Sequence, residues 1–578
     1  MDEIKDGTEQ LDCDVLIIGG GTAGPMAALR AKKKNPKANI VLLDKANVKR
    51  SGAISMGMDG LNNSVIPGYA TPEQYTKEIT IANDGICDQA AVFRYAQECY
   101  GIIQELDSFG IRFQKDNNGE YDVKKVHHIG TYVLPMPNGD TVKKALYRQL
   151  RKARINVVNR YMATRLLLSE ERIAGAICVN TRSAEFLVVR AKSVIMCLGA
   201  AGRLGLPSSG YLYGTYENAS NSGEGYSMAY HAGAALANLE CFQINPLIKD
   251  YNGPACAYVA GPMGGYTANA NGEKFIECDY WSGQMMQEFY DELQSGNGPV
   301  FLKLNHLAEE TVSEIERVLH IVERPTRGHF HEGRGTDYRK QMIEMHISEI
   351  GFCSGHSASG VYVDENARTT IPGLYAAGDM ANVPHNYMLG AFTNGAIAGE
   401  DAIDFSAEVG FATLDQDEIK KEKQRVLAPT KRTDGIPPNQ IEYKTRRLVN
   451  DYLQPPKVTA KMQLAQQRFA EVRDDMENNM YVQNSHELMR ALEASSILDC
   501  ADMAAHASLY RTESRWGLYH NRVEYQRNDD DWFCHTLLTR DSEGNPVSKK
   551  QNVKPYIVEI SEDEKGAYDK QRVNATAD

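Results

Sequence analysis

Long apolar runs and a surplus of positive charge are both missing from this sequence of 578 residues. No apolar stretch reaches the roughly 18 residues that a membrane-spanning helix requires, so we expect any membrane contact to be made through a partner. The net charge is −13, and an acidic protein repels phosphate backbones, which argues against nucleic acid as a partner. The first twelve residues lack the basic start and apolar stretch of a secretory signal, so we expect a cytoplasmic protein.

Closely spaced cysteines are also missing. The chain has 11 cysteines, and no two of them form a C-x-x-C pair. Iron–sulfur clusters are typically held by cysteines at such short spacings, so we expect no cluster in this chain. His127 and His128 are neighbours, but no third ligand with metal spacing is near them, so we predict no metal site.

A strand–helix–strand pattern is the first feature that is present. The chain is too long for one hydrophobic core, and we expect two to four domains. Residues 15–18 form an apolar run that is typical of a buried parallel strand. Residues 22–34 predict a helix, and residues 40–43 predict a second apolar strand. This order is the opening of a doubly wound sheet.

A glycine motif lies between the first strand and the helix. Gly19, Gly21 and Gly24 form G-x-G-x-x-G, and Asp44 ends the second strand. Gly19 permits a tight turn, Gly21 lets a diphosphate approach the backbone, and Gly24 lets the helix pack on the strand. The helix N-terminus favours phosphate charge, and Asp44 can accept hydrogen bonds from a ribose. A ligand-free glycine turn would not explain this acid, so we predict dinucleotide binding.

Two further strand–turn segments decide which dinucleotide is expected. The apolar run 193–198 ends at Gly199, and the segment 373–379, GLYAAGD, ends with Gly378 and Asp379. Large flavoproteins use a second glycine–acid turn of this kind at the ribityl and phosphate part of FAD. An NAD enzyme would need neither segment, so we predict FAD.

These pieces predict an α/β fold with a discontinuous cofactor domain. We expect a doubly wound, Rossmann-like FAD-binding domain over residues 1–240 and 352–405. Residues 241–351 would form an inserted α+β capping domain that closes over the cofactor and excludes water. Residues 406–578 would form a C-terminal helical domain with an irregular, polar tail.

Five segments resemble one known family. They are residues 44–63 (DKANVKRSGAISMGMDGLNN), 221–234 (NSGEGYSMAYHAGA), 271–277 (NGEKFIE), 298–307 (GPVFLKLNHL) and 511–525 (RTESRWGLYHNRVEY). With them the chain resembles the succinate dehydrogenase and fumarate reductase flavoprotein family, and within it the adenylylsulfate reductase alpha subunit branch. The resemblance implies an FAD-dependent oxidoreductase. It also implies further cofactor contacts at Lys45, Ser51, Gly52, Gly57, Gly390 and Ala391.

Departures from the family pattern bear on the cofactor linkage and the substrate. Family members with covalent FAD attach it to a histidine where this chain has Gly52, so we expect non-covalent FAD. Asn245 stands where succinate and fumarate enzymes have a histidine, and Met388 where they have an arginine. An arginine of the adenylylsulfate branch would fall near Leu247. Since anions need cationic contacts, we expect a less charged substrate.

Five residues are the candidates for the chemistry. His356 lies in a loop of small residues and could exchange a proton with a substrate, or be held in a turn. His385 and Tyr387 precede the loop expected at the flavin ring, where they could polarise a substrate or simply pack. Trp281 could stack on a planar substrate or belong to a core. Arg327 could bind an anion, although arginines more often form surface ion pairs.

We therefore predict FAD-mediated redox of a small substrate. The resemblance alone implies a ferredoxin-like iron–sulfur partner subunit, and a higher oligomer is compatible with it. Two alternatives stay open: a stand-alone oxidase or dehydrogenase that resembles L-aspartate oxidase, and a catalytically silent FAD-binding scaffold. The sequence does not name the substrate or the direction of electron flow.

Overall fold

A computed structural model describes most of the chain. The described residues are 8–56, 60–125, 132–136, 139–213, 215, 217–251, 260–276, 282–323, 325–561 and 564. Gly57, Trp281, His127 and His128 lie outside the described residues. Within the described part, no helix is both long and apolar enough to cross a bilayer.

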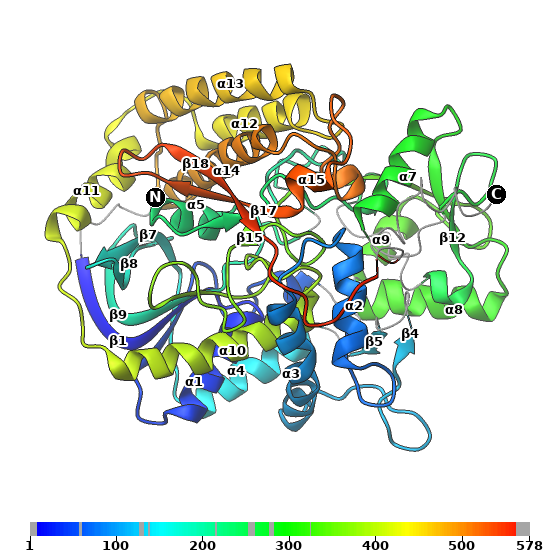
Figure 1. Ribbon diagram of the computed structural model, residues 1–578, viewed down its shortest axis with the longest axis horizontal. Helices are drawn as coiled ribbons and strands as arrows, with labels where there is room; N and C mark the ends of the chain where they lie inside the picture. The colour runs from blue at the N-terminus through cyan, green and yellow to red at the C-terminus, as the bar shows by residue number, and fades with distance from the viewer. Residues whose placement is uncertain are drawn as a thin grey trace.

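A seven-stranded sheet forms the centre of the cofactor domain (Figure 1). Its order is β6-β2-β1-β9-β8-β7, and β16 pairs with the end of β9. β1, β2, β6, β9 and β16 run parallel, whereas β7 and β8 are antiparallel to their neighbours. The bounds are β1 (Thr8–Ile18), β2 (Ile40–Asp44), β6 (Asn156–Asn159), β7 (Tyr161–Ser169), β8 (Arg172–Asn180), β9 (Phe186–Met196) and β16 (Leu374–Ala376).

Helices pack on this sheet as the sequence pattern predicts. α1 (Ala23–Lys34) and α10 (Tyr387–Glu408) pack against each other and against β1 and β9. The helix predicted over residues 22–34 begins one residue later, because Thr22 is its N-cap. Nearby lie η1 (Ala53–Met56), β3 (Gly60–Asn62), α2 (Pro72–Ala82), α3 (Gln89–Ser108), β4 (Lys124–Lys125), β5 (Tyr132–Pro135) and α4 (Gly139–Lys152). The doubly wound α/β class is confirmed.

A second, antiparallel sheet lies to the right in Figure 1. Its order is β11-β14-β13-β12, and its strands and helices all come from one inserted stretch of the chain. The strands are β11 (Pro246–Ile248), β12 (Tyr266–Ala268), β13 (Val300–Lys303) and β14 (Ile343–Ile347). The helices are η2 (Gly261–Met263), α7 (Gly283–Gln294), α8 (Glu309–Glu316), η3 (Arg317–Glu323) and α9 (Pro325–Glu332). This α+β unit is the predicted insertion, and its exact boundaries stay a prediction.

Helices dominate the last third of the chain. They are α11 (Gln416–Leu427), η4 (Ala428–Lys431), α12 (Pro438–Tyr452), α13 (Thr459–Asn478) and α14 (Ser485–Tyr510). α14 packs against α12, α13 and α5 (Glu224–His231). After η5 (Gly517–Tyr519) and α15 (Asp529–Trp532), the tail is less irregular than expected. Its hairpin, β17 (Cys534–Arg540) with β18 (Pro546–Asn552), joins a sheet with β10 (Leu236–Ala237) and β15 (Gly360–Val361).

A buried ion network ties these helices to the cofactor domain. The Glu493 carboxylate of α14 accepts from Lys45 Nζ at 2.9 Å and from Arg203 Nη1 at 2.7 Å. Arg203 also pairs with Glu442 of α12, and Lys45 pairs with Glu224 of α5. Burial raises the pKa of Glu493, but Lys45, Arg203 and the neighbouring Arg490 outweigh it and hold this pKa down to about 2. The network therefore fixes α12 and α14 against the end of β2.

Candidate functional site

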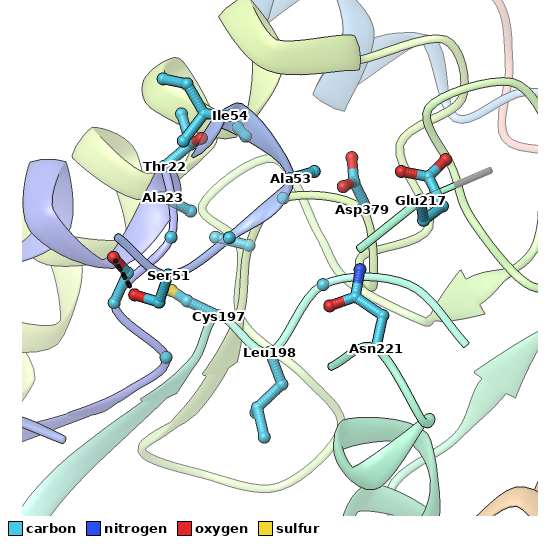
Figure 2. A pocket seen from close by; sticks show the side chains of 18 of the residues that line it. Thr22, Ala23, Ser51, Ala53, Ile54, Cys197, Leu198, Glu217, Asn221 and Asp379 are labelled. Atoms are coloured by element: carbon cyan, nitrogen blue, oxygen red, sulfur yellow. Dashed lines mark hydrogen bonds between the residues drawn. The ribbon is translucent and has the colours of Figure 1, made fainter. Parts of the chain in front are cut away.

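A cavity opens where four parallel strands end (Figure 2). It is lined by the turns that follow β1 (residues 19–23), β2 (residues 44–46), β9 (residues 197–199) and β16 (residues 377–379). In open α/β sheets, ligands bind at the carboxyl ends of the strands, where the N-termini of the following helices also point. The cavity thus lies where the sequence argument places a dinucleotide.

Glycines let three backbone segments meet at this cavity. A Cβ atom on Gly19, whose φ is +110°, would lie 2.1 Å from the carbonyl oxygen of Cys197. One on Gly24 would lie 1.9 Å from the Gly19 oxygen, so this glycine brings helix and strand together without lining the cavity. One on Gly52, whose φ is +89°, would lie 2.5 Å from Gly21 Cα. A diphosphate can therefore approach bare backbone here.

The Asp44 carboxylate holds the glycine turn and lines the cavity. It accepts from the Gly20 amide and from the Ala46 amide, each at 2.8 Å. The Ser51 hydroxyl donates to the Gly20 carbonyl at 3.1 Å. A carboxylate has about four acceptor positions, so Asp44 keeps acceptor capacity for ribose hydroxyls. Lys45, Ser51, Gly52, Gly199 and Ala391 also line the cavity.

Two of the catalytic candidates meet in the cavity wall. His356 and Tyr387 both line it, and their rings stand edge to face with centroids 4.7 Å apart. His385 lies behind them, outside the lining, with its Nδ1 3.5 Å from the Tyr387 hydroxyl oxygen. The His385 carbonyl accepts from Asn63 Nδ2 at 2.8 Å and from the Tyr75 hydroxyl at 3.3 Å. His385 thus anchors the segment that carries Tyr387.

The structure does not bring Arg327 or Gly390 to the cavity lining. Arg327 is buried in α9 of the inserted unit, with its guanidinium 5.9 Å from the centre of the Tyr251 ring. Gly390 lies in the first turn of α10, where a Cβ would meet Asn386 Cβ at 2.4 Å. Gly390 is thus held in a close packing contact within its helix, and neither residue lines the cavity.

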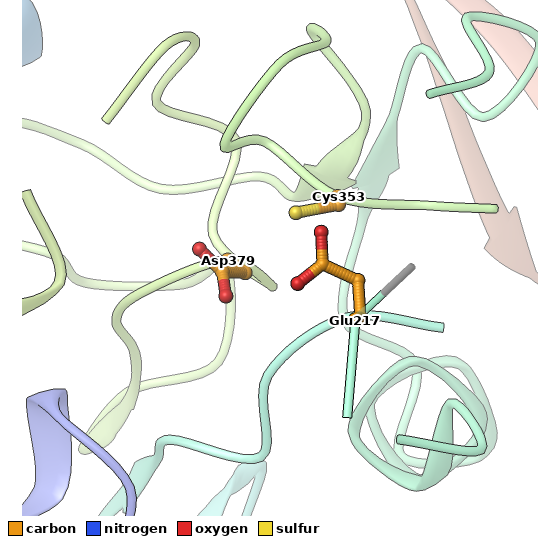
Figure 3. Close-up of side chains that lie close together, drawn as sticks. All are labelled: Glu217, Cys353 and Asp379. Carbon is orange, nitrogen blue, oxygen red and sulfur yellow. The ribbon is translucent and has the colours of Figure 1, made fainter. Parts of the chain in front are cut away.

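Two residues that the sequence did not single out, Glu217 and Cys353, form a cluster with the predicted Asp379 (Figure 3). Side-chain atoms of Glu217, Cys353 and Asp379 lie within 4.8 Å of one another, and all three residues line the cavity. Burial, and next the Glu217 charge, raise the pKa of the Asp379 carboxyl to about 8. Burial raises the pKa of the Cys353 thiol as well. A metal could bind to this cluster only if these groups gave up their protons.

The Asp379 proton gives the apoprotein a specific pH dependence. The unfolded chain releases this proton near pH 4, whereas the folded chain holds it to about pH 8. The free energy of unfolding should therefore fall as the pH rises from 4 to 8. Asp379→Asn should flatten this slope and remove an infrared band of a protonated carboxyl at pH 7. The exposed Asp451→Asn is the control, and an unchanged slope in Asp379→Asn would contradict the assignment.

Comparison with known proteins settles the class of protein. The FAD binding domain family matches residues 14–393, which is more than half of the chain. The fumarate reductase flavoprotein C-terminal family matches residues 443–565. The chain is a flavoprotein of the fumarate reductase and succinate dehydrogenase family. The predictions of FAD and of an FAD-dependent oxidoreductase are confirmed.

Relatives of this flavoprotein match along nearly the whole chain. The fumarate reductase flavoprotein subunit of Mycobacterium tuberculosis is 24% identical, and the match covers 92% of this chain and 95% of the relative. That of Escherichia coli K12 is 23% identical and covers 94% of each. Among solved structures, adenylylsulfate reductase from Archaeoglobus fulgidus has a TM-score of 0.88 at 23% identity, covering 97% of this chain and 99% of the other. The structural likeness shows a shared fold.

The described residues of the flavoprotein fit FAD. The glycine turn and the N-terminus of α1 suit a diphosphate, and Asp44 suits a ribose. The cavity continues from there past Gly199 and Gly378 to His356 and Tyr387, which leaves an extended path for the rest of the cofactor.

Proposed function

We propose that this flavoprotein acts, in the cytoplasm, on a small substrate that is neutral or cationic rather than a dicarboxylate. The charge of the cavity wall carries this proposal. Among the described lining residues, Lys45 is the single lysine or arginine, and Glu224 and Glu493 already neutralise it. The acids of the wall are Asp44, Glu217, Glu224 and Asp379. The described lining therefore offers a dicarboxylate no free lysine or arginine as a cationic clamp.

Side chains of the cavity wall would position the substrate and exchange protons with it. When bound, FAD supplies the hydride or electron-pair chemistry. His356 and Tyr387 would orient the substrate by hydrogen bonds from the cavity wall. The Asp379 carboxyl, beside Glu217, would hold a proton at neutral pH and release it within the cavity. The inserted unit would keep water from these groups.

We propose further that FAD is held without a covalent bond. The family resemblance implies that a covalent attachment would use a histidine at position 52, where this chain has glycine. Gly52 has a φ of +89°, and any side chain there would collide with the Gly21 backbone. At this position the protein would therefore contact FAD through its backbone and not through a covalent bond.

An iron–sulfur partner subunit is the proposed electron acceptor or donor. The nine cysteines that the structure describes are buried and free. Among the described residues, no three cysteines lie close enough together to hold a cluster. Relatives of this chain are named as flavoprotein subunits, which supports a partner that carries the clusters.

One purification tests these proposals. The native protein is isolated anaerobically, its visible spectrum is recorded, and the flavin is assayed after acid precipitation. We expect released FAD, a broad brown absorbance and a small co-purifying subunit. FAD without the brown absorbance would overturn the partner and favour a stand-alone oxidase, and flavin in the pellet would overturn the non-covalent assignment. A flavin that no physiological donor reduces would indicate a silent scaffold.

A titration with dicarboxylates tests the substrate class. Fumarate or malonate should leave the flavin spectrum unchanged at millimolar concentration; tight binding of either would overturn the substrate class.

A further inference from the structure

A buried lysine lies directly behind the glycine turn. Lys143 projects from α4, and its side chain is 1% exposed. Its Nζ donates to the Gly20 carbonyl at 2.5 Å and to the Gly21 carbonyl at 2.9 Å. Gly20 and Gly21 line the cavity, but Lys143 does not. The ammonium group therefore reaches the cavity only through these two peptide groups.

Peptide geometry gives these contacts a consequence inside the cavity. In a trans peptide, the N–H of one residue points opposite to the C=O of the residue before it. Because the Gly20 and Gly21 carbonyls face Lys143, the amides of Gly21 and Thr22 face away from it, toward the cavity. In the described part of the chain, neither amide donates to another residue. Thr22 is also the N-cap of α1, so the helix N-terminus adds to the same positive region.

The Gly20 peptide groups are fixed on both sides. The Gly20 N–H donates to Asp44, and the Gly20 carbonyl accepts from both Ser51 and Lys143. Burial lowers the pKa of Lys143 to about 8, and the nearby Asp44 charge opposes this shift. A lysine in such a place is costly to bury, and an apolar side chain would fill the same space at less cost. Both of its hydrogen bonds go to the glycine turn.

We propose that Lys143 is a positioning residue for the diphosphate of FAD. It does not touch the cofactor. It turns two backbone amides toward the diphosphate and places a positive charge behind them. The proposal rests on FAD binding, which the family shows, and is independent of the substrate proposed above.

Binding of adenosine ligands to the apoprotein tests this role. Lys143→Met should weaken FAD and ADP about ten- to a hundred-fold, the range for loss of a charge-assisted contact, while adenosine binds as in the wild type. Affinities are measured by flavin fluorescence for FAD and by calorimetry for ADP and adenosine. The matched control is Lys152→Met, which removes an exposed lysine from the last turn of the same helix and should change nothing.

The outcomes separate positioning from general support of the fold. If Lys143→Met lost equal affinity for ADP and adenosine, Lys143 would only support the fold. If ADP affinity were unchanged, Lys143 would have no role in diphosphate binding. Either result overturns the proposal. Should Lys143→Met fail to fold, Lys143→Gln keeps two N–H donors but lacks the charge. It should retain adenosine and lose about ten-fold in ADP affinity. Wild-type ADP affinity in a folded Lys143→Gln would equally overturn the proposal.

Discussion

Gly52→Ala should leave a folded protein that purifies almost free of flavin. The new Cβ would lie 2.5 Å from Gly21 Cα, a contact that neither backbone segment can relieve without moving the glycine turn. The positive φ of +89° adds about 1 kcal/mol for any residue other than glycine. We expect FAD affinity to fall at least a hundred-fold, because the displaced turn no longer presents its amides to the diphosphate. The ratio of flavin to protein absorbance measures the loss.

Gly68→Ala is the matched control for this prediction. Gly68 has nearly the same φ, +90°, but an added Cβ would meet no heavy atom within 4 Å. This variant should lose a little stability and keep its FAD. If Gly52→Ala and Gly68→Ala bound FAD equally well, steric contact with Gly21 would not control cofactor binding.

Glu493→Gln should lower the free energy of unfolding by about 1.5–3 kcal/mol, the range for loss of a hydrogen bond to a charged group, because buried Lys45 and Arg203 each lose one of two carboxylate partners. Glu493 is 1% exposed and pairs with both Lys45 and Arg203. Urea unfolding at pH 7 measures the change. The control is Glu471→Gln on α13, which breaks an exposed pair with Arg468 and should cost under about 1 kcal/mol.

The pH dependence of this effect has a fixed sign. The pKa of Glu493 falls from 4.5 to about 2 on folding, so its contribution is complete above pH 4.5 and disappears as the pH approaches 2. The stability difference between wild type and Glu493→Gln should narrow over the same interval. A difference that stayed constant from pH 5 to pH 2 would mean that the Glu493 charge is not what joins α14 to the cofactor domain.

The cofactor turn could be predicted because its signal is local. Gly19, Gly21, Gly24 and Asp44 lie within one strand–helix–strand unit, where backbone geometry restricts the residues allowed. Asp379 could be found because a second glycine–acid turn ends β16. The ends of strands were harder to predict: the run at 193–198 overlaps only the last four residues of β9, which begins at Phe186 and is interrupted by the charged residues Arg190 and Lys192.

The cluster around Asp379 could not be predicted, because its members are far apart in the chain. Glu217 lies in a loop with no periodic pattern, and Cys353 reads as one more isolated thiol. Only the fold brings them within 4.8 Å of Asp379. Lys143 was hidden for a different reason: nothing in its helix distinguishes a lysine that faces a carbonyl pair from the neighbouring exposed Lys144.

The order in which the ribosome makes the chain has a consequence for cofactor capture. The cavity draws its walls from residue 18 to residue 391, and the ion network that braces it ends at Glu493. During synthesis, β1 and its glycine turn are therefore made some 350 residues before β16, the last strand whose end lines the cavity. Until then the edge of β9 that β16 will cover is unpaired and prone to wrong association. We therefore expect FAD to bind late in synthesis, after β16 has been made. Before that point, chaperones would have to cover the unpaired edge of β9.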